Sequence, residues 1–266
     1  YPIGIVQTAL GGTRLSLWNP NEDGILYFDM IRIIEEYVGE IKAILWYQGC
    51  SDALPQIADD YYERFMNMVS KLRTALRMPK LPVLTAQLNR SIAIGEDNDD
   101  GWAKVREAQR KAAHNENIYV VPTIDMTLSD AIHNDCRSNV AIGQRMAETA
   151  LKNIYKFENI LCSAPDIEDA VLMEGIKVEL TFRNVYGELN YCSDLDKNFF
   201  TVSDNFGKIA VQNISADKNK MTITLEKSPD SNVFISGACE KNPTRVLPYD
   251  TFTRLPILAF YMFKVK

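Results

Sequence analysis

The sequence lacks the features that proteins use to bind nucleic acids or to cross a membrane. Its net charge is −6 and its pI is near 5.1, and Lys and Arg form no run that could follow a phosphate backbone. No apolar run approaches the roughly 18–20 residues that span a bilayer. We therefore expect no membrane span, and neither nucleic acid nor an anionic membrane surface as a partner.

Metal-binding side chains are also scarce, since the chain has two histidines and five cysteines. The cysteines are scattered and form no Cys-x-x-Cys pair: Cys50, Cys136, Cys162, Cys192 and Cys239. This pattern predicts no zinc site. The odd count and wide spacing argue against a disulfide framework, although one bridge between Cys192 and Cys239 stays an open alternative. Cysteine usage leaves the cellular compartment undecided.

A chain of 266 residues that is 46% hydrophobic and 24% charged has the composition of an ordinary globular protein. This length suits one large domain or two smaller ones. The chain does not begin with Met, and Tyr1 leads directly into an apolar run. We therefore expect a mature form or a fragment of a longer chain.

The first part of the chain alternates between short apolar runs and amphipathic stretches. The runs typical of buried strands are Pro2–Leu10, Ile41–Tyr47, Leu81–Leu88 and Ile118–Ile124. The stretches with helical spacing are Asp29–Glu40, Ala58–Leu76, Trp102–Ala113 and Ser138–Tyr155. This alternation predicts an α/β domain over residues 1–157, with a doubly wound parallel sheet and helices on both faces.

After Glu158 the pattern changes to short runs with alternating or β-branched residues. These runs lie at 176–182, 199–202, 209–214, 220–225 and 232–237. Turn residues separate them, as in Asp204–Gly207 and Asp217–Asn219. We therefore expect an all-β, sandwich-like domain over residues 158–266.

One of the two histidines follows an acid by three positions, in Asp130-Ala-Ile-His133. A short loop with this spacing can fold back so that the carboxylate accepts the imidazole N–H. The other ring nitrogen is then free to take a proton from a nucleophile. The spacing is also typical of a hydrogen-bonded loop pair without a catalytic role. Asp130 and His133 are therefore candidates for the orienting acid and the base of a hydrolase.

Distinctive residues follow two of the predicted strands. Gly11-Gly12 comes directly after the first, where a turn could present bare backbone N–H groups. Gln48 follows the second, at the end where open α/β sheets build their sites. The alternatives are a structural turn with positive φ at the glycines and a helix cap at Gln48. Trp18 and Trp46 could be core residues.

Several blocks, taken in order, resemble the sialate O-acetylesterase family. They are a strand followed by Gly-Gly-Thr and Trp, a strand ending in Trp-Tyr-Gln-Gly-x-Ser-Asp, Val-Arg-Glu-Ala-Gln, and Asp-x-x-His. The family comprises carbohydrate esterases of the SGNH-hydrolase superfamily, close to the family-6 acetylxylan esterases. The matching blocks are Ile3–Trp18, Leu45–Asp52, Trp102–Gln109 and Ile124–Leu151. Thr244–Tyr249 and Arg254–Phe260 resemble the family's C-terminal β-segment.

The resemblance implies a three-layer αβα fold of the SGNH-hydrolase type, with a site at the carboxyl ends of the strands. It also implies a serine nucleophile that attacks an acetyl carbonyl, with His133 as the base and Asp130 orienting the imidazole. The oxyanion would be held by backbone N–H groups of Gly11 and Gly12 and by the side-chain amide of Gln48.

Two departures from the family's pattern bear on activity. The Gly-Gln-Ser-Asn block that carries the family's nucleophile does not occur, so we expect that serine on a segment preceding Tyr1. Ser16 and Ser51 follow the wrong elements to replace it. Cys50 stands where the family has Glu, and Asn134 where a Pro usually follows the histidine. Cys50 as a thiol nucleophile is a further alternative, which would need a lowered pKa.

The sequence therefore predicts a carbohydrate O-acetylesterase of the Ser-His-Asp type that uses no metal or cofactor. The expected partners are an acetylated sugar or glycan, above all O-acetylated sialic acid, and the chain's own upstream segment. We expect a periplasmic or secreted location. The alternative is a catalytically inactive sugar-binding module on the same scaffold, which the replacement of an acid by Cys50 motivates.

Overall fold

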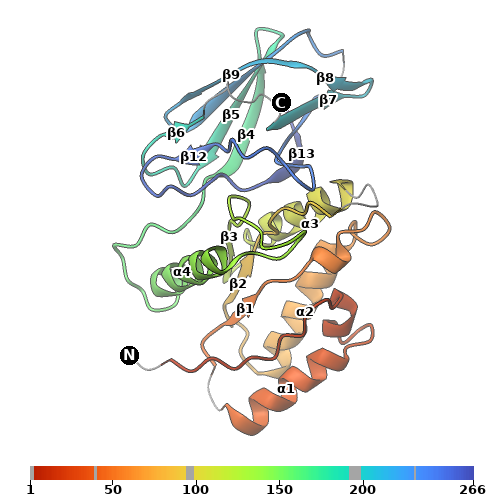
Figure 1. Ribbon diagram of the computed structural model, residues 1–266, viewed down its shortest axis with the longest axis vertical. Helices are drawn as coiled ribbons and strands as arrows, with labels where there is room; N and C mark the ends of the chain where they lie inside the picture. The colour runs from red at the N-terminus through yellow and green to blue at the C-terminus, as the bar shows by residue number, and fades with distance from the viewer. Residues whose placement is uncertain (1–2, 39–40, 94–98, 192–198, 231) are drawn as a thin grey trace.

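The computed structural model describes residues 3–38, 41–93, 99–191, 199–230 and 232–266. Helices and a parallel sheet make up the chain up to residue 153, and antiparallel strands follow from residue 166 (Figure 1). This order confirms the predicted fold class, an α/β part followed by a β-rich part. The domain boundary after residue 157 stays a prediction.

Three parallel strands form the sheet of the first part. They are β1 (Ile44–Trp46), β2 (Val83–Ala86) and β3 (Ile118–Val121), in the order β1-β2-β3. All four residues of β2 are buried, because β2 is central and helices cover both faces of the sheet. Strands that are buried on both faces consist largely of apolar and β-branched residues, whereas strands with one exposed face alternate apolar and polar residues.

Helices lie on both faces of this sheet. They are α1 (Ile25–Tyr37), α2 (Tyr61–Ala75), α3 (Asp99–Ala112) and α4 (Cys136–Asn153), with two short 3-10 helices, η1 (Leu15–Trp18) and η2 (Cys50–Asp52). On one face, Phe65 of α2 and Val105 of α3 share a buried cluster with Val83. On the other face, Ile142 of α4 is buried with Leu84. The predicted three-layer αβα arrangement is therefore confirmed.

The predicted first strand is not a strand in the structure. Residues 3–10 run as an extended trace that pairs with no strand among the described residues (Figure 1). Ile3, Ile5 and Leu10 are 63%, 81% and 57% exposed. The prediction of a buried strand at Pro2–Leu10 is therefore wrong for its described residues. An apolar, β-branched run becomes a strand only where a neighbouring strand satisfies its backbone groups.

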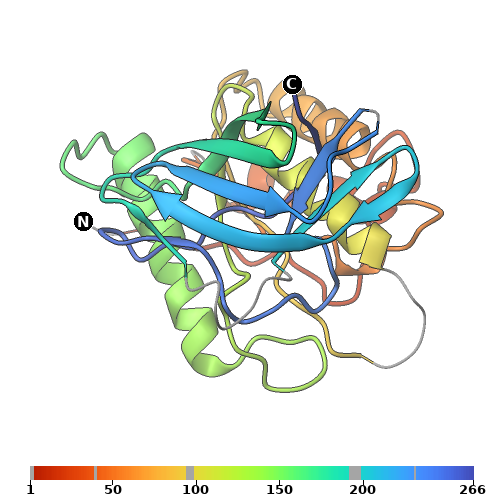
Figure 2. The same ribbon diagram turned by 90° about the horizontal axis from the view of Figure 1, so that it is seen from above.

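The β-rich part consists of two four-stranded antiparallel sheets and one small strand pair. The sheets have the orders β4-β5-β10-β9 and β13-β11-β7-β8, and β12 pairs with β6. The strands are β4 (Asp166–Met173), β5 (Lys177–Arg183), β6 (Leu189–Asn190), β7 (Phe200–Asp204), β8 (Gly207–Ile209), β9 (Val211–Asp217), β10 (Lys220–Leu225), β11 (Phe234–Gly237), β12 (Tyr249–Asp250) and β13 (Phe260–Lys264). Leu180 and Ile235, from different sheets, belong to one buried core. The expected sandwich-like packing is confirmed, and Figure 2, which is seen from above, shows these strands in front of the helices.

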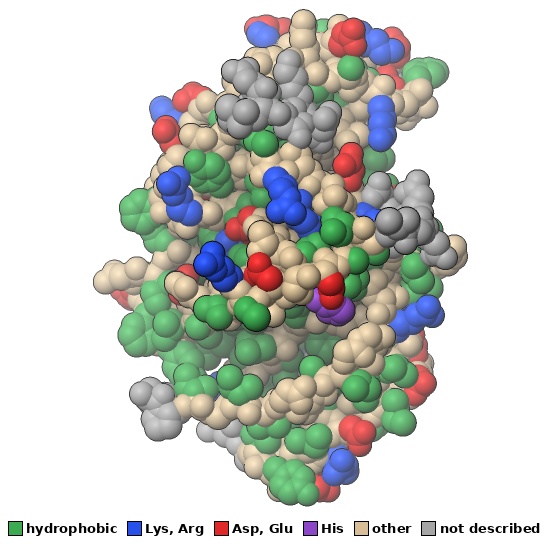
Figure 3. All heavy atoms as spheres, viewed as in Figure 1, with side chains coloured by type: hydrophobic (Ala, Val, Ile, Leu, Met, Phe, Trp, Pro, Cys, Tyr) green, Lys and Arg blue, Asp and Glu red, His purple; other side chains and the backbone are tan. Residues whose placement is uncertain are grey.

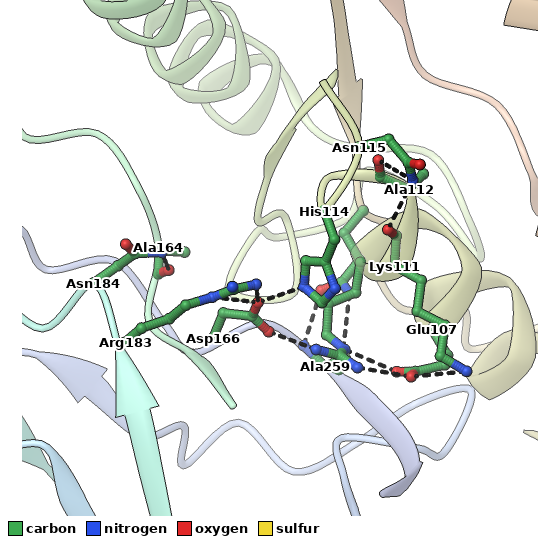
Figure 4. Close-up of polar contacts among 12 residues, drawn as sticks. Glu107, Lys111, Ala112, His114, Asn115, Ala164, Asp166, Arg183, Asn184 and Ala259 are labelled. Carbon is green, nitrogen blue, oxygen red and sulfur yellow. Dashed lines mark hydrogen bonds and ion pairs between the residues drawn. The ribbon is translucent and has the colours of Figure 1, made fainter. Parts of the chain in front are cut away.

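A buried ion-pair cluster joins α3 to the first strands of the β-rich part (Figure 4). Arg110 contacts Glu107 of its own helix and Asp166 of β4, each at 2.8 Å. Asp166 also accepts from His114 at 2.9 Å and from Arg183 of β5. Burial alone would raise the pKa of Asp166, but the hydrogen bonds and positive charges around it bring that pKa down to about 2. The carboxylate is therefore the charged centre of this junction.

Two further expectations concern the cysteines and the membrane. Cys192 lies outside the described residues, so the bridge to Cys239 stays untested, and Cys239 contacts Thr201 Oγ1 through its sulfur at 3.7 Å. In the described ranges, no helix has the length and apolar character that crossing a membrane requires.

Candidate active site

The Asp130–His133 loop forms a hydrogen-bonded pair at the carboxyl end of the parallel sheet, between β3 and α4. Asp130 Oδ2 lies 2.8 Å from His133 Nδ1. Asp130 Oδ1 accepts the backbone N–H groups of Ile132 and His133 at 2.9 and 2.8 Å. One carboxylate therefore fixes both the imidazole ring and the backbone that carries it.

Charge and exposure suit His133 to proton transfer. Backbone hydrogen bonds from His133 and Ile132 lower the pKa of Asp130 to about 2. The ionised carboxylate accepts the proton on Nδ1, which leaves Nε2 as the basic ring nitrogen. The His133 side chain is 76% exposed, and within the described residues its ring contacts no polar group except Asp130. A nucleophile or substrate can therefore reach Nε2.

Neighbouring contacts close this loop and lead it into α4. Ser129 N donates to His133 O at 2.8 Å, so the loop closes on itself. Asp135 is the N-cap of α4, and its side chain accepts Ser138 N at 2.8 Å. Ile132 packs against the hydrophobic cluster that contains residues of α2 and α3. The loop therefore closes through its own hydrogen bonds and packs on the core through Ile132.

The Gly11-Gly12 turn leads from the N-terminal segment into η1. Gly12 has a φ of 72°, a left-handed conformation that favours glycine. A Cβ atom at either glycine would meet no atom within 4 Å, so the space beside the turn is open. Thr13 Oγ1 donates to Leu10 O at 2.8 Å and accepts from Trp18 Nε1 at 3.0 Å. The hydrogen bonds of Thr13 therefore hold the turn in place, and the two glycines remain accessible.

Gln48 holds this turn against the end of β1. Its Nε2 donates to Thr13 O at 3.0 Å and to Asp52 Oδ2 at 2.6 Å, and its Oε1 accepts from Tyr61 OH at 3.0 Å. Both hydrogens of the amide are thus engaged inside the protein. To donate to an oxyanion, Gln48 would have to release either Thr13 or Asp52.

Asp52 organises this region, although no role was predicted for it from the sequence. Its carboxylate is fully buried and accepts from Leu15 N at 2.8 Å, from Gln48, and from Arg64 Nη1 at 3.1 Å. Arg64 also pairs with Glu22 at 2.8 Å. Asp52 therefore joins η1, η2 and α2. Its signal in the sequence was its place at the end of the Trp-Tyr-Gln-Gly-x-Ser-Asp block.

Side chains of α3 support the ends of two strands. Gln109 Nε2 donates to Gln48 O at 2.9 Å, and its Oε1 accepts from Leu88 N at 2.9 Å. Arg106 is fully buried and donates to Leu88 O at 3.0 Å and to Glu240 O at 2.6 Å. The Val-Arg-Glu-Ala-Gln block therefore links β1 and β2 to each other and to the β-rich part.

Cys50 does not have the properties of a thiol nucleophile. Burial raises the pKa of its thiol to about 11, so the thiol is protonated at neutral pH. This disfavours the alternative of a thiol hydrolase. Within the described ranges, His, Cys, Asp and Glu form no group of three or more that could hold a metal ion.

The outer edge of β1 faces an open region. Among the described strands, β1 pairs with β2 alone, and Leu45 and Tyr47 are 53% and 40% exposed. Figure 3 shows a hollow between the N-terminal segment and the body of the molecule, rimmed largely by hydrophobic side chains. An unpaired strand edge beside apolar groups is the kind of surface to which a further strand adds.

Comparisons with known proteins bear on the family of this chain. Residues 1–152 match the model of a family described as carbohydrate esterase, sialic acid-specific acetylesterase. A protein of Arabidopsis thaliana described as a probable carbohydrate esterase is 35% identical over 156 residues, which cover 57% of this chain and 56% of that protein.

The fold as a whole is similar to that of a solved structure. A carbohydrate acetylesterase from Xanthomonas citri has a TM-score of 0.79 and 23% sequence identity, with 94% of this chain and 58% of the other covered. This similarity supports the fold of both parts. The chain thus spans slightly more than half the length of each of these two relatives.

Proposed function

Because the chain belongs to the sialic acid-specific acetylesterase family of carbohydrate esterases, we propose that it hydrolyses acetyl esters on sugars by a Ser-His-Asp mechanism. The Asp130–His133 pair carries this proposal. Its oxygen and nitrogen lie 2.8 Å apart, and the exposed Nε2 lies on a loop at the carboxyl end of the sheet, where α/β folds bind their ligands.

In the proposed reaction, a serine Oγ attacks the acetyl carbonyl carbon while His133 Nε2 takes the hydroxyl proton. The sugar oxygen leaves with that proton, and water then hydrolyses the acetyl-serine by the same route. Asp130 keeps Nε2 free and stabilises the imidazolium that forms. Such acid–base catalysis contributes about 100- to 10,000-fold to the rate.

The oxyanion of the tetrahedral intermediate needs hydrogen-bond donors close to the serine. We assign this role to backbone N–H groups of Gly11 and Gly12, because the space beside them is open and they precede Thr13, which Gln48 holds in place. Gln48 is the third proposed donor, and it can act only after its amide leaves Thr13 or Asp52. Loss of one donor of this kind costs about 3–4 kcal/mol of transition-state stabilisation.

We place the serine on a segment that precedes Tyr1. Within the described residues, no Ser, Thr or Cys side chain contacts the His133 ring. The open edge of β1 and the apolar rim of the hollow beside it offer a place for an added strand. A strand parallel to β1 would end near Gln48, at the same edge of the sheet as the His133 loop. This segment is then a partner of residues 1–266.

O-acetylated sialic acid is the substrate that we propose, since the matched family is described by that specificity. Acetylated xylan is the alternative that the resemblance to family-6 acetylxylan esterases suggests. Extracellular glycans carry such esters, and this supports the proposal of a periplasmic or secreted location.

Active-site labelling tests the mechanism, with the upstream sequence restored. A fluorophosphonate, which reacts with activated serines, should label one serine before Tyr1, and His133→Ala should abolish the label. The same sample should release acetate from O-acetylated sialic acid. A labelled serine within residues 1–266 would overturn its upstream placement. Neither label nor acetate in any sample would favour the inactive sugar-binding module.

A further inference from the structure

Asn134, the residue after His133, lies between the ends of β1 and β2. Its Oδ1 accepts from Asn89 Nδ2 at 2.6 Å, and its Nδ2 donates to Tyr47 OH at 3.1 Å. Tyr47 directly follows β1, and Asn89 comes three residues after β2. One side-chain amide therefore ties the His133 loop to the carboxyl ends of both strands.

Asn89 is itself a fixed point. It is 3% exposed, and its backbone oxygen accepts from Arg106 Nη2 at 2.8 Å. Its Nδ2 also lies 3.4 Å from Met126 O, in the segment that leads from β3 to the loop. The hydrogen bond from Asn89 therefore connects Asn134 to the buried segment that follows β2.

A second attachment lies on the other side of His133. Ala131 O accepts from Ile92 N at 2.8 Å and from Ser91 Oγ at 3.3 Å. The loop is thus held to the segment after β2 at Ala131 and to the strand ends at Asn134. Without the contacts of Asn134, the loop would keep its internal hydrogen bonds and the apolar contact of Ile132. The hydrogen bonds to Ala131 O would then hold the loop without the help of Asn134 and would open more often.

We propose that Asn134 is a positioning residue for His133. Asp130 orients the imidazole within the loop, whereas Asn134 orients the whole loop on the sheet and so aims Nε2 at the nucleophile. The second half of this proposal rests on His133 being the base of the proposed function. A hydrogen-bonding residue next to the base fixes a geometry that catalysis needs to within a fraction of an ångström.

Amide hydrogen exchange tests the positioning without reference to activity. The Ile92 N–H donates to Ala131 O, so its exchange reports whether the loop stays docked. Asn134→Ala should speed this exchange about tenfold. Asn134→Asp should keep it slow, because a carboxylate can accept from both Asn89 and the Tyr47 hydroxyl. The control Asn153→Ala removes an amide bound to Thr149 O at 2.9 Å and should leave the Ile92 exchange unchanged.

A second variant tests whether a folding defect at position 134, rather than the lost hydrogen bond, causes the faster exchange. Asn89→Ala removes the same hydrogen bond from its other end and should also speed the exchange of the Ile92 N–H. Both substitutions break one shared contact. The Ile92 N–H should therefore exchange more slowly in the double variant than the product of the two single-variant rate increases would predict. Fully additive effects would contradict the link between Asn89 and Asn134.

Kinetics then decide whether the position matters for catalysis. In the sample that releases acetate, Asn134→Ala should lower kcat about 100-fold while KM changes less than about twofold. Unchanged exchange of the Ile92 N–H overturns the proposal. Faster exchange with an unchanged kcat overturns the positioning role alone, and His133→Ala in the same assay decides separately whether His133 is the base. In a sample without activity, the exchange still decides whether Asn134 holds the loop.

Discussion

At the scale of single residues, the proposed chemistry depends on the three hydrogen bonds that Asp130 accepts. Contacts over so few positions are local, so the sequence could predict the pairing with His133. The spacing could not reveal what holds the loop on the sheet, since Asn134 contacts Tyr47 and Asn89, which are distant in the sequence. The same holds for Asp52, whose partner Leu15 lies in another element.

Asp130→Asn should lower kcat by about 100- to 10,000-fold. An asparagine at this position can donate to Nδ1, which would place the ring proton on Nε2 and remove the base. KM should change little, because Asp130 acts through the ring. Steady-state acetate release measures both quantities, with Asp29→Asn on the exposed face of α1 as the control. An unchanged kcat in Asp130→Asn would remove Asp130 from the mechanism.

Cys50→Ala should retain acetate release to within about threefold. The thiol has a pKa raised by burial to about 11, so it contributes no thiolate at neutral pH. Rate measurements near pH 7.5 on the wild type and the variant check this, as does iodoacetamide, which should leave the activity of the native protein intact. Complete loss of activity in a folded Cys50→Ala protein would revive the thiol mechanism.

At the scale of elements, local periodicity predicted the helices well, and it failed where an element depends on a distant neighbour. The helix predicted at Ala58–Leu76 is observed as α2, Tyr61–Ala75, because amphipathic spacing is a property of the segment itself. Strand β4 escaped prediction because acids interrupt its apolar pattern, and the buried Asp166 pairs with Arg110 of α3, which is distant in the sequence. Residues 3–10 show the converse error, an apolar run that finds no partner strand among the described residues.

The open edge of β1 should make residues 1–266 self-associate when they are produced alone. Leu45→Lys places a charge on the exposed edge and should shift the protein toward a monomer, because charged edge residues oppose strand pairing. Size-exclusion chromatography with light scattering measures the mass, and Val140→Lys, at a 73% exposed position on α4, is the matched control. A monomeric wild type without a bound peptide would contradict this expectation.

At the scale of the whole molecule, the β-rich part is connected to the site as well as to the helices. Arg106 reaches from α3 to Glu240 O, and Asn89, which contacts the His133 loop through Asn134, accepts from the same guanidinium. The ion-pair cluster around Asp166 forms a second connection at the C-terminal end of α3. The β-rich part therefore supports the geometry of the parallel sheet.

Asp166→Asn should destabilise the protein by about 3 kcal/mol, because it leaves the charge of the buried Arg110 with less compensation. The folded-state pKa of Asp166 is depressed to about 2. Its carboxylate therefore stabilises the fold above the unfolded-state pKa of about 4, and this stabilisation is lost as the pH falls through about 2.

Urea unfolding between pH 7 and pH 2 checks both effects of Asp166→Asn. The variant should lose part of the acid dependence that the wild type shows. Asp169→Asn is the control on the same strand, since its partner Lys266 is 72% exposed, and it should change the unfolding free energy by at most about 1 kcal/mol. Equal effects of the two substitutions would show that Asp166 in its buried cluster stabilises the fold no more than an exposed ion pair does.

The most direct test of the central claim is acetate release from an O-acetylated sugar by the chain with its upstream sequence restored, compared with His133→Ala. We expect the wild type to release acetate and His133→Ala to lose at least about 100-fold of the rate, with both proteins equally folded. Wild-type activity that survives in His133→Ala would contradict the role of the Asp130–His133 pair and the mechanism built on it.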